Sequence, residues 1–460
     1  MSDYQLIVIG AGPGGYTAAL RAAKLGLHTA IVERREVGGT CLNRGCIPTK
    51  TLLHASQVYY DAVNGACVGV HGSLSYDIGE MFAFKRSVSE KLRSGIHALL
   101  KGAKVDVIEG MAQIAAPGQG DVTGADGAVT RYTAERILAA TGSVNVRPPI
   151  PVLELPGVMT SDELLEGSDT PNQSIVIIGG GVIGVEFATF YSHLGCQVTL
   201  VEGMANLLPQ LDRELGQNLA QILKKQGVEV LTSAMVQSVE QAADGLCVHL
   251  EQKGKELTVT GEKVLCAIGR RAYFDGLFAA GLTPALNGKR LLVDESYQTS
   301  IPGVYAIGDA SAAVQLAHVA AAQGTDCVER MCGGKGSIDL NVIPSCIYSA
   351  PEIAVVGLTE AEAKEQGIPA VSGKCTLLSN ARTIIEDPGR CFMKLVARTD
   401  THALIGAQLM CQHASDMISQ LSTAMVNRLT VEQLLTVMRP HPSFEEALGE
   451  AVENLASKLA

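Results

Sequence analysis

The 460-residue chain contains no tryptophan, and aromatic residues make up only 4% of it. Positive charge is not in excess either, because 36 lysines and arginines are outnumbered by 47 aspartates and glutamates, for a formal net charge of −11. A protein that binds nucleic acid needs a basic surface to neutralise phosphates, so the composition argues against a nucleic-acid partner. Docking to a basic protein module is compatible with the same charge.

Long uninterrupted apolar runs are missing as well. The most apolar stretch, residues 174–190, contains four glycines and Glu186, so it predicts a buried strand that enters a helix rather than a membrane span. The opening residues MSDYQLIVIGAG lack the cationic and apolar blocks of a signal peptide. We therefore expect a cytoplasmic protein without membrane insertion, in which most of the 12 cysteines are reduced.

The residues that are present indicate an α/β protein with several domains. A length of 460 residues exceeds what one hydrophobic core usually supports. The 47% of hydrophobic residues can fill more than one core, and the 49 glycines suit many tight turns between strands and helices.

One pattern occurs twice. Residues 4–33 and 173–202 each contain an apolar strand, the motif Gly-x-Gly-x-x-Gly, a helix, Leu-Gly and a second apolar strand that ends in glutamate. The glycines of such a βαβ unit let the backbone approach a pyrophosphate at the helix N-terminus, and the glutamate accepts hydrogen bonds from ribose. Each unit therefore predicts a dinucleotide site. The residues concerned are Gly10, Gly12, Gly15 and Glu33 in the first unit, and Gly179, Gly181, Gly184 and Glu202 in the second.

The second glutamate also indicates which nicotinamide cofactor binds. A 2′-phosphate beside Glu202 would meet a carboxylate instead of the arginine it needs, so we expect NAD rather than NADP. Two dinucleotides in one chain favour electron transfer between a tightly held flavin and an exchangeable nicotinamide.

The repeated pattern divides the chain into four segments. The first dinucleotide-binding segment, residues 1–147, contains an insert between about residues 33 and 102. A second dinucleotide-binding domain follows at residues 148–268, and residues 269–337 return to the first domain. Residues 338–460 form a C-terminal domain of strands and helices. The prolines of residues 144–157 predict an extended crossing between the units, and a second crossing should follow Gly269. Residues 299–310 predict a buried strand that completes the first domain.

Cys41 and Cys46 lie in the insert, within GGTCLNRGCIPTKTLLHA. Their spacing alone is compatible with metal ligands, a structural pair or a redox pair. A zinc site would need further cysteines or histidines at ligand spacing, and none accompanies them, so we predict no metal site. Cys327 and Cys332 repeat the spacing in a helical sequence, where five residues give about 7.5 Å of rise and about 140° of rotation, so we expect them to be unbonded.

The setting of the first pair favours redox chemistry. Gly38, Gly39 and Gly45 permit the distorted backbone that a close pair of cysteines needs. Pro48 favours a helix that starts just beyond it, and the helix N-terminus together with Lys50 would favour a thiolate. With two dinucleotide sites in the chain, we interpret these cysteines as a redox pair.

Two further pairs of titratable residues are candidates. Glu186 lies in an apolar helix, where a buried carboxylate would need a cation such as Lys50; otherwise both are solvated helix residues. His441 lies between two prolines, and Glu446 five residues on can orient the imidazole as a general base, although a lone histidine is more often structural.

Together these residues resemble the class I pyridine nucleotide-disulfide oxidoreductases, over the whole chain. GGTCLNRGCIPTK is similar to the redox signature of that family, with Arg44 and Thr49 as in the members that oxidise dihydrolipoamide. The segments similar to its FAD and interface motifs are VIGAGPGGYTAA, ILAATGS, GVYAIGDA and YSAPEIAVVGLTEAEAK. The resemblance implies a glutathione-reductase-like α/β fold, with two Rossmann-like domains that bind FAD and NAD and an α+β C-terminal dimerisation domain.

The resemblance also implies roles for single residues. Cys41 would meet the substrate and Cys46 the flavin, and the base His441 would come from the other subunit of an obligate homodimer. The catalytic residues so implied are Cys41, Cys46, Lys50, Glu186, His441 and Glu446. Further cofactor-binding positions are Gly14, Gly39, Thr40, Lys50, Thr141, Gly142, Gly269, Arg270 and Gly308, with Asp309 for the ribityl chain of FAD.

Three departures from the family pattern bear on substrate or partner preference. Arg439 replaces the first histidine of the catalytic segment, Gln323 replaces glutamate, and Ala272 with Tyr273 replaces proline and asparagine. We expect oxidation of dihydrolipoamide, free or on a lipoyl-bearing protein, with reduction of NAD⁺. Another NAD(P)H-dependent disulfide reductase and a non-catalytic NADH-binding flavoprotein are the alternatives. A 2-oxo acid, acetoin or glycine-cleavage complex would each fit as the partner.

Overall fold

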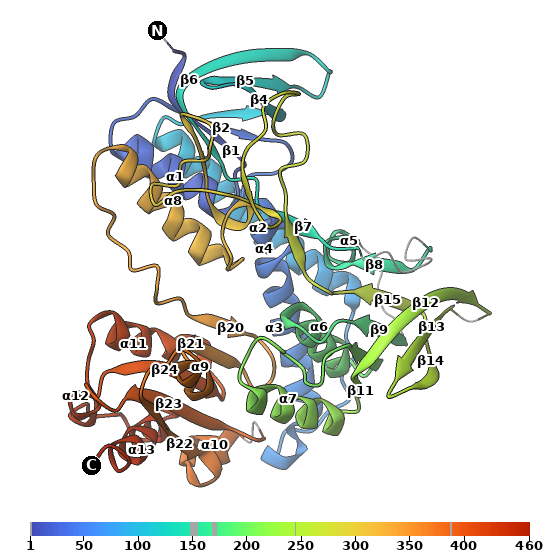
Figure 1. The fold of residues 1–460 in the computed structure, drawn as a ribbon. Helices are drawn as coiled ribbons and strands as arrows, with labels where there is room; N and C mark the ends of the chain where they lie inside the picture. The colour runs from blue at the N-terminus through green and yellow to red at the C-terminus, as the bar shows by residue number, and fades with distance from the viewer. Residues whose placement is uncertain (1, 148–154, 168–172, 244, 387–388) are drawn as a thin grey trace.

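The computed structural model describes residues 2–147, 155–167, 173–243, 245–386 and 389–460. Figure 1 shows a first sheet region at the top with the N-terminus, a second sheet region at the right, and a C-terminal region at the lower left. Among the described residues, no helix is long and apolar enough to span a bilayer.

The first dinucleotide unit forms the expected βαβ opening. Strand β1 (Tyr4–Ile9) pairs in parallel with β2 (Thr29–Glu33), and α1 (Pro13–Lys24) connects them. The sheet has the order β3-β2-β1-β6-β5-β4. Residues 6–9 are buried, as expected for a strand covered on both faces. The other strands are β3 (Asp106–Glu109), β4 (Met111–Ala116), β5 (Gln119–Thr123) and β6 (Val129–Ala139).

A late segment of the chain returns to this sheet. Strand β19 (Val304–Ala306) pairs in parallel with β6, which confirms that residues 299–310 contribute a strand to the first unit. The short η2 (Gly308–Ala310) follows, and α8 (Ala317–Met331) packs against α1. Cys327 lies inside α8, Cys332 lies just past its end, and both thiols are free, as expected.

The insert that carries the cysteine pair is helical. Helix α2 (Gly39–Arg44) is followed after Gly45 by α3 (Cys46–Val63), η1 (Gly65–Val68) and α4 (Ile78–Gly102). The prediction that a helix starts just beyond Pro48 was wrong by two to three residues, because α3 begins at Cys46. Proline is tolerated there, since N–H groups in the first turn of a helix have no intrahelical partner.

The second unit repeats the arrangement of the first. Strands β9 (Ser174–Ile178) and β10 (Gln197–Glu202) pair in parallel and are joined by α6 (Val182–His193). Helix α6 is buried on nearly all sides, because it packs on its own sheet and on α3, where Leu52 and Phe187 share one core. The sheet order is β11-β10-β9-β15-β8, and β12-β13-β14 form a separate antiparallel sheet. The remaining elements are β8 (Val158–Thr160), α5 (Ser161–Glu166), α7 (Arg213–Lys225), β11 (Glu229–Thr232), β12 (Ala234–Ala242), β13 (Gly245–Gln252), β14 (Lys255–Gly261) and β15 (Lys263–Cys266).

Two crossing strands connect the units. Strand β7 (Ser143–Asn145) leaves the first unit, β16 (Arg270–Ala272) returns to it, and the two pair antiparallel. The crossing expected after Gly269 is therefore present. Residues 148–154 of the predicted linker, and with them the boundary predicted at 147/148, lie outside the described residues, and the other domain boundaries stay predictions. The short hairpin of β17 (Leu286–Asn287) and β18 (Arg290–Leu291) comes before β19.

The C-terminal region is an antiparallel sheet with helices packed against it. Its strand order is β20-β21-β24-β23-β22. Helix α13 contacts β22 and β23, while α11 contacts β21 and β24. The elements are β20 (Ser345–Ile347), β21 (Ile353–Gly357), α9 (Glu360–Glu365), β22 (Ala370–Thr376), η3 (Leu377–Ser379), α10 (Ala381–Glu386), β23 (Phe392–Arg398), β24 (Leu404–Met410), α11 (Ala414–Val426), α12 (Val431–Leu435) and α13 (Glu445–Ala456).

Candidate active site

The two glycine turns have the same close contacts. A Cβ atom on Gly15 would lie 1.8 Å from the carbonyl oxygen of Gly10, and a Cβ atom on Gly184 would lie 1.8 Å from that of Gly179. Gly10 and Gly179 have φ angles of +101° and +111°, which favour glycine. Both turns therefore require glycine, and each brings a helix N-terminus close to the end of a strand, as phosphate binding needs.

Glu33 and Glu202 hold these turns with equivalent hydrogen bonds. The Ala11 N–H donates to Oε2 of Glu33 at 2.7 Å, and the Gly180 N–H donates to Oε2 of Glu202 at 2.6 Å. The other oxygen of each carboxylate accepts from the backbone N–H two residues further on, at 2.9 Å and 2.7 Å. Because each carboxylate oxygen has a second lone pair, both glutamates can still accept a ribose hydroxyl.

The surroundings of the turns fit a dinucleotide. A cavity beside the first turn is lined by Gly10, Glu33, Arg34, Thr141 and Tyr273, among others. The Arg34 guanidinium lies 4.3 Å from the centre of the Tyr273 ring and donates to its hydroxyl at 2.6 Å. Tyr273, which departs from the family pattern, therefore closes one side of the cavity together with Arg34. Three further predicted positions have no other atom within 4 Å of where a Cβ would lie, which leaves space for a ligand: Gly142, Gly181 and Gly269.

The N-terminus of α2 lies against the first turn. The Gly38 N–H donates to the carbonyl oxygen of Ala11 at 2.8 Å, and a Cβ atom on Gly39 would come within 2.6 Å of the Gly12 Cα. Gly38 and Gly39 have φ angles of +98° and +60°. The start of α2, with Thr40, is therefore fixed beside the predicted flavin site.

Cys41 and Cys46 lie on two helices that meet at a tight connection. Cys41 is in α2, Cys46 is the first residue of α3, and a Cβ atom on the intervening Gly45 would lie 2.9 Å from the Thr40 carbonyl oxygen. Both thiols are free, and they lie close enough for each to influence the acidity of the other.

The two thiols differ in acidity. The hydrogen bond from Cys41 is the largest influence on Cys46; burial opposes it, the charge of Lys50 assists it, and the pKa of Cys46 falls to about 7. The same hydrogen bond, together with burial, raises the pKa of Cys41 well above its usual range. Of the two thiols, Cys46 is therefore the one that favours the thiolate form.

Lys50 and Glu186 form the expected ion pair. The Lys50 Nζ donates to both carboxylate oxygens at 2.8 Å, and Glu186 is only 3% exposed. Burial lowers the pKa of Lys50, but the charge and hydrogen bond of Glu186 outweigh it, so the net pKa is raised. A charged lysine is thereby held next to Cys46.

Sequence analysis missed the part that Tyr348 plays in this arrangement, and it named Arg44 only as a member of the family signature, without its contacts. The Tyr348 N–H donates to Oε1 of Glu186 at 3.1 Å, and the Lys50 Nζ lies 4.8 Å from the centre of the Tyr348 ring. Arg44 is buried and bonds to Glu36 and, at 2.7 Å, to Glu166, so it ties α2 to α5. Both residues stand in segments that resemble the family, and that was the only signal for them.

Asp309 belongs to a hydrogen-bond network at the crossing strands. The Ser143 hydroxyl donates to Oδ2 of Asp309 at 2.6 Å, and Nε of Arg270 donates to that hydroxyl at 2.9 Å. Arg270 also bonds to Asn145 at 2.6 Å and Asp162 at 3.1 Å. These contacts give Arg270 a structural role in joining β7 and β16, while its role in cofactor binding stays a prediction.

Two departures from the family pattern have clear local functions. The side-chain oxygen of Gln323 accepts from the Gly308 N–H at 2.8 Å, so it still provides an acceptor beside Asp309. Arg439 donates to the carbonyl oxygen of Val437 at 2.9 Å, just past the end of α12. A cation stabilises the carbonyl groups at a helix C-terminus.

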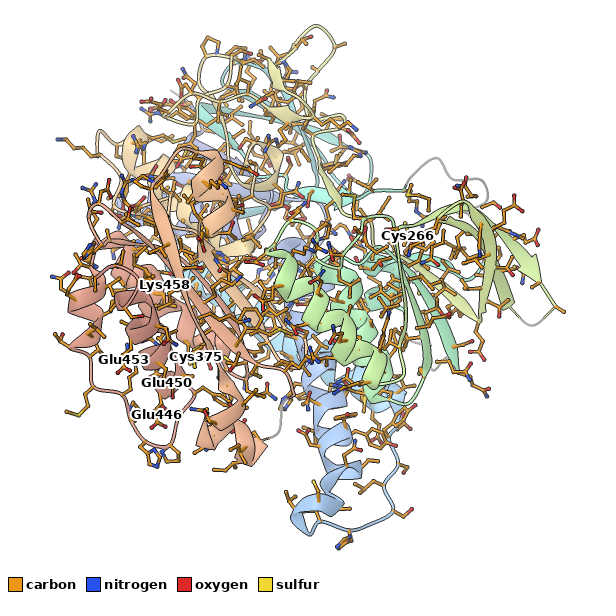
Figure 2. All side chains as sticks on the ribbon, turned by 60° about the horizontal axis from the view of Figure 1, so that its bottom comes forward. Cys266, Cys375, Glu446, Glu450, Glu453 and Lys458 are labelled. Atoms are coloured by element: carbon orange, nitrogen blue, oxygen red, sulfur yellow. The ribbon has the colours of Figure 1, made fainter. Side chains whose placement is uncertain are left out.

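His441 and Glu446 form the expected pair, but at a distance from the cysteines. Nδ1 of His441 lies 2.8 Å from Oε1 of Glu446, while Oε2 accepts from the Ser443 N–H at 3.0 Å. The His441 side chain is 75% exposed. Helix α13, which carries Glu446, is well separated from α2 in Figure 1, and Figure 2 shows Glu446 at the edge of the C-terminal region. The pair therefore lies apart from Cys41 and Cys46 of the same chain.

Comparisons with known proteins agree with this arrangement. Residues 4–324 match the family model described as pyridine nucleotide-disulphide oxidoreductase, and residues 343–452 match its dimerisation domain. The chain is 37% identical over 465 residues to the dihydrolipoyl dehydrogenase of Bacillus subtilis (strain 168), and the alignment covers 98% of this chain and 97% of that protein. It is 36% identical over 458 residues to the dihydrolipoyl dehydrogenase of Geobacillus stearothermophilus, which covers 98% and 96%.

Solved structures show the same likeness. LpdA from Mycobacterium tuberculosis gives a TM-score of 0.88 at 28% identity, over 98% of this chain and 99% of that chain. The HOCl-induced flavoprotein disulfide reductase RclA from Escherichia coli gives a TM-score of 0.86 at 29% identity, over 99% of both chains.

These similarities confirm the predicted fold class, with FAD- and NAD-binding domains and a C-terminal dimerisation domain, as well as the two cofactors, FAD and NAD(H). The matched segments account for nearly the whole chain, which belongs to the pyridine nucleotide-disulphide oxidoreductase family of enzymes.

Proposed function

We propose that this chain is a dihydrolipoyl dehydrogenase, which oxidises dihydrolipoamide to lipoamide and reduces NAD⁺. The observation that carries a dithiol reaction is the pair of Cys41 and Cys46 at the junction of α2 and α3, beside the Lys50–Glu186 ion pair. The lowered pKa of Cys46 agrees with it. The choice of dihydrolipoamide is supported by relatives that bear the name dihydrolipoyl dehydrogenase and are 36% to 38% identical over nearly the full chain.

In this proposal the reaction starts with the oxidised cysteine pair. His441 of the partner subunit, oriented by the partner's Glu446, takes the proton from one substrate thiol. The resulting thiolate attacks Sγ of Cys41, the bond between Cys41 and Cys46 breaks, and Cys46 leaves as a thiolate. Its low pKa makes it a good leaving group, and Lys50 compensates its charge.

The second substrate thiol completes the exchange. It loses its proton and attacks the substrate sulfur that is bound to Cys41, which releases the cyclic disulfide and leaves the sulfur of Cys41 to take up a proton. The substrate has then lost two electrons and the cysteine pair has gained them. Gly10, Gly15 and Glu33 would hold FAD at the first turn, and Gly179, Gly184 and Glu202 would hold NAD⁺ at the second. Bound FAD would supply the route by which these electrons reach NAD⁺.

Steady-state kinetics with the purified holoenzyme test this proposal. We expect turnover of dihydrolipoamide with NAD⁺ to exceed by far the reduction of glutathione disulfide with NADH or NADPH. The reverse preference would favour another disulfide reductase, a class supported by the likeness to RclA.

Cysteine variants test the alternative of a non-catalytic NADH-binding flavoprotein. Cys41→Ser and Cys46→Ser should both abolish thiol-linked turnover, whereas an NADH-binding flavoprotein without dithiol chemistry would keep its function. Two-electron reduction of the native enzyme should also produce a long-wavelength thiolate-to-flavin absorption band that Cys46→Ser lacks.

We further propose that the enzyme acts as a homodimer in the cytoplasm on a lipoyl-bearing protein of a 2-oxo acid, acetoin or glycine-cleavage complex. The dimerisation domain supports the dimer, and the net charge of −11 supports docking to a basic module. Association with a complex core that does not weaken as salt is raised would contradict electrostatic docking.

A further inference from the structure

The outer face of the β12–β13 hairpin carries three side chains of metal-binding type. Glu240 on β12 and Cys247 on β13 are directly opposite each other, and His249 follows Cys247 by two residues. Alternate side chains of a strand point to the same face, so all three lie together. Leu246 and Val248, which alternate with them, are buried in the core on the other face.

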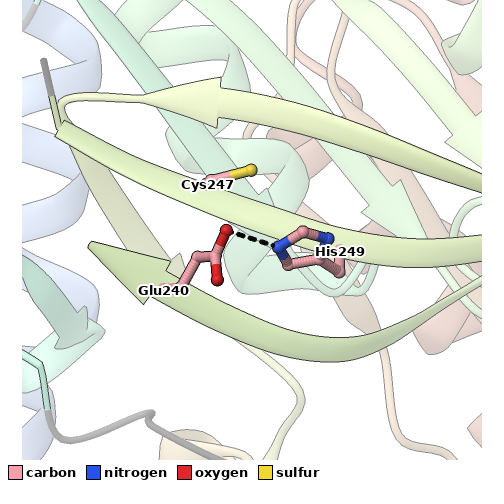
Figure 3. Close-up of side chains that lie close together, drawn as sticks. All are labelled: Glu240, Cys247 and His249. Atoms are coloured by element: carbon pink, nitrogen blue, oxygen red, sulfur yellow. Dashed lines mark ion pairs between the residues drawn. The ribbon is translucent and has the colours of Figure 1, made fainter. Parts of the chain in front are cut away.

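The three side chains already converge. Oε1 of Glu240 lies 2.9 Å from Nε2 of His249, and the thiol of Cys247 belongs to the same group, with the three potential ligand atoms within 4.8 Å of one another (Figure 3). The His249 side chain is 38% exposed and that of Glu240 is 62% exposed. An ion can therefore reach the group from solvent without any opening of the sheet.

The chemistry of the group selects one class of ion. Calcium and magnesium prefer sites built from oxygen ligands, whereas a thiolate, an imidazole and a carboxylate together are typical of Zn²⁺. Zinc bonds to such ligands at about 2.0 to 2.3 Å in a tetrahedral arrangement, so three ligand atoms that already lie within 4.8 Å of one another are close to what a shared ion needs. Three protein ligands leave a fourth position for water.

We propose that Glu240, Cys247 and His249 form a surface Zn²⁺ site that joins β12 to β13, separate from the redox cysteines. Coordination takes the thiolate form of Cys247, and its proton passes to solvent. No electron transfer is involved, and the site does not depend on the reaction proposed above. Sequence analysis predicted no metal site, because Cys247 and His249 form no recognised motif and Glu240 joins them only through the strand register.

Binding of Zn²⁺ to the full-length holoenzyme, measured by competition with a chromophoric chelator, tests this site. A Cys41→Ser/Cys46→Ser background removes the redox thiols as competing ligands. We expect one Zn²⁺ per chain in this background. Cys247→Ser and His249→Gln should each lower the affinity for Zn²⁺ by about tenfold or more, because even the loss of a residue that only supports a metal ligand lowers metal affinity by about that factor. Cys332→Ser is the matched control, because that cysteine is exposed and lies just past the end of α8, outside the β12–β13 hairpin. The affinity of this variant for Zn²⁺ should not change.

Two further measurements separate coordination from effects on folding. Co²⁺ in place of Zn²⁺ should give a thiolate-to-metal absorption band that Cys247→Ser loses and Cys332→Ser keeps. Zn²⁺ should raise the Tm of the Cys41→Ser/Cys46→Ser protein but not that of its Cys247→Ser derivative, while the two have the same Tm in chelator. Zinc binding that is unchanged by Cys247→Ser, or a stoichiometry well below one, would overturn the proposal.

Discussion

The Nζ atom of Lys50 lies 2.8 Å from each carboxylate oxygen of Glu186, and this contact fastens α3 of the insert to α6 of the second dinucleotide unit. The partners are not equally buried, since the Lys50 side chain is 30% exposed and that of Glu186 only 3%. Loss of one partner therefore has different consequences from loss of the other.

Lys50→Met should destabilise the protein more than Glu186→Gln. The first change leaves a buried carboxylate without a cation, which costs about 3 kcal/mol or more. The second leaves a lysine that can reach water, and glutamine still accepts from the Tyr348 N–H, so we expect a loss of about 1 kcal/mol. Urea unfolding of the holoenzyme measures both, and equal losses would contradict this explanation.

The pH dependence of the thiolate-to-flavin band should report the acidity of Cys46. The pKa of Cys46 is lowered to about 7, so the thiolate and the band should increase as pH rises through 7. Because the hydrogen bond from Cys41 is the larger influence and Lys50 the smaller, Cys41→Ala should move the midpoint to higher pH further than Lys50→Met does. A midpoint unchanged in Cys41→Ala would show that the hydrogen bond does not set this pKa.

Glu446→Gln should weaken the base without removing it. The Nδ1 of His441 lies 2.8 Å from Oε1 of Glu446, and a neutral amide orients the ring less firmly, so kcat should fall, but by less than in His441→Gln. His441→Gln should lower kcat by about 10²- to 10⁴-fold. Glu453→Gln, an exposed change on the same helix, is the control and should leave kcat unchanged.

Glu202→Gln should reduce the preference for NAD⁺ over NADP⁺. The carboxylate repels a 2′-phosphate, and its loss removes that repulsion while an amide oxygen remains as acceptor. Glu33→Gln is the matched control, because it makes the equivalent change at the first turn. It should affect retention of FAD and leave the ratio of kcat/KM for the two nicotinamides unchanged.

His193 should make the protein less stable in acid. Its ring is buried and stacks on Tyr60 with 4.4 Å between ring centres, and neither ring nitrogen has a hydrogen-bond partner among the described residues. Burial lowers its pKa to about 4, whereas an unfolded histidine titrates near about 6.5. Between these values the unfolded chain binds more protons, so the free energy of unfolding falls as pH decreases, by at most about 3 kcal/mol.

Urea unfolding between pH 7 and pH 4 measures this contribution. His193→Phe keeps the stacking on Tyr60 and cannot titrate, so its unfolding free energy should vary less with pH than that of the native protein. His97→Gln changes an exposed histidine and should follow the native curve. Parallel curves for the native protein and His193→Phe would rule out this histidine as the cause.

The sequence predicted the site most reliably where a local pattern determines local geometry. The duplicated glycine turns, Glu33 and Glu202 follow from the requirements of one βαβ unit, and the structure gives them equivalent bonds. The contact between Glu186 and Lys50 was predicted only from the energetic need of a buried carboxylate, because nothing in the local sequence brings α3 and α6 together.

Other features depend on tertiary packing and could not be read from the chain. Tyr348 reaches Glu186 through its backbone N–H, which carries no sequence signal. The guanidinium of Arg270 is held by Asn145 and Ser143 because two distant strands pair. The start of α3 at Cys46 was not predicted either, because proline is tolerated at several positions in the first turn of a helix and so does not determine the first residue.

The pairing of β7 with β16 brings the two ends of the second dinucleotide unit side by side. Asn145 and Arg270 face each other across this pair, and such partners have Cα atoms about 5 Å apart, so a very short peptide can splice the first unit into a continuous chain. A nucleotide-binding cassette of different preference can be grafted at the same two points. The graft must bring a carboxylate to the position of Glu186, because otherwise Lys50 would be left without its counter-ion.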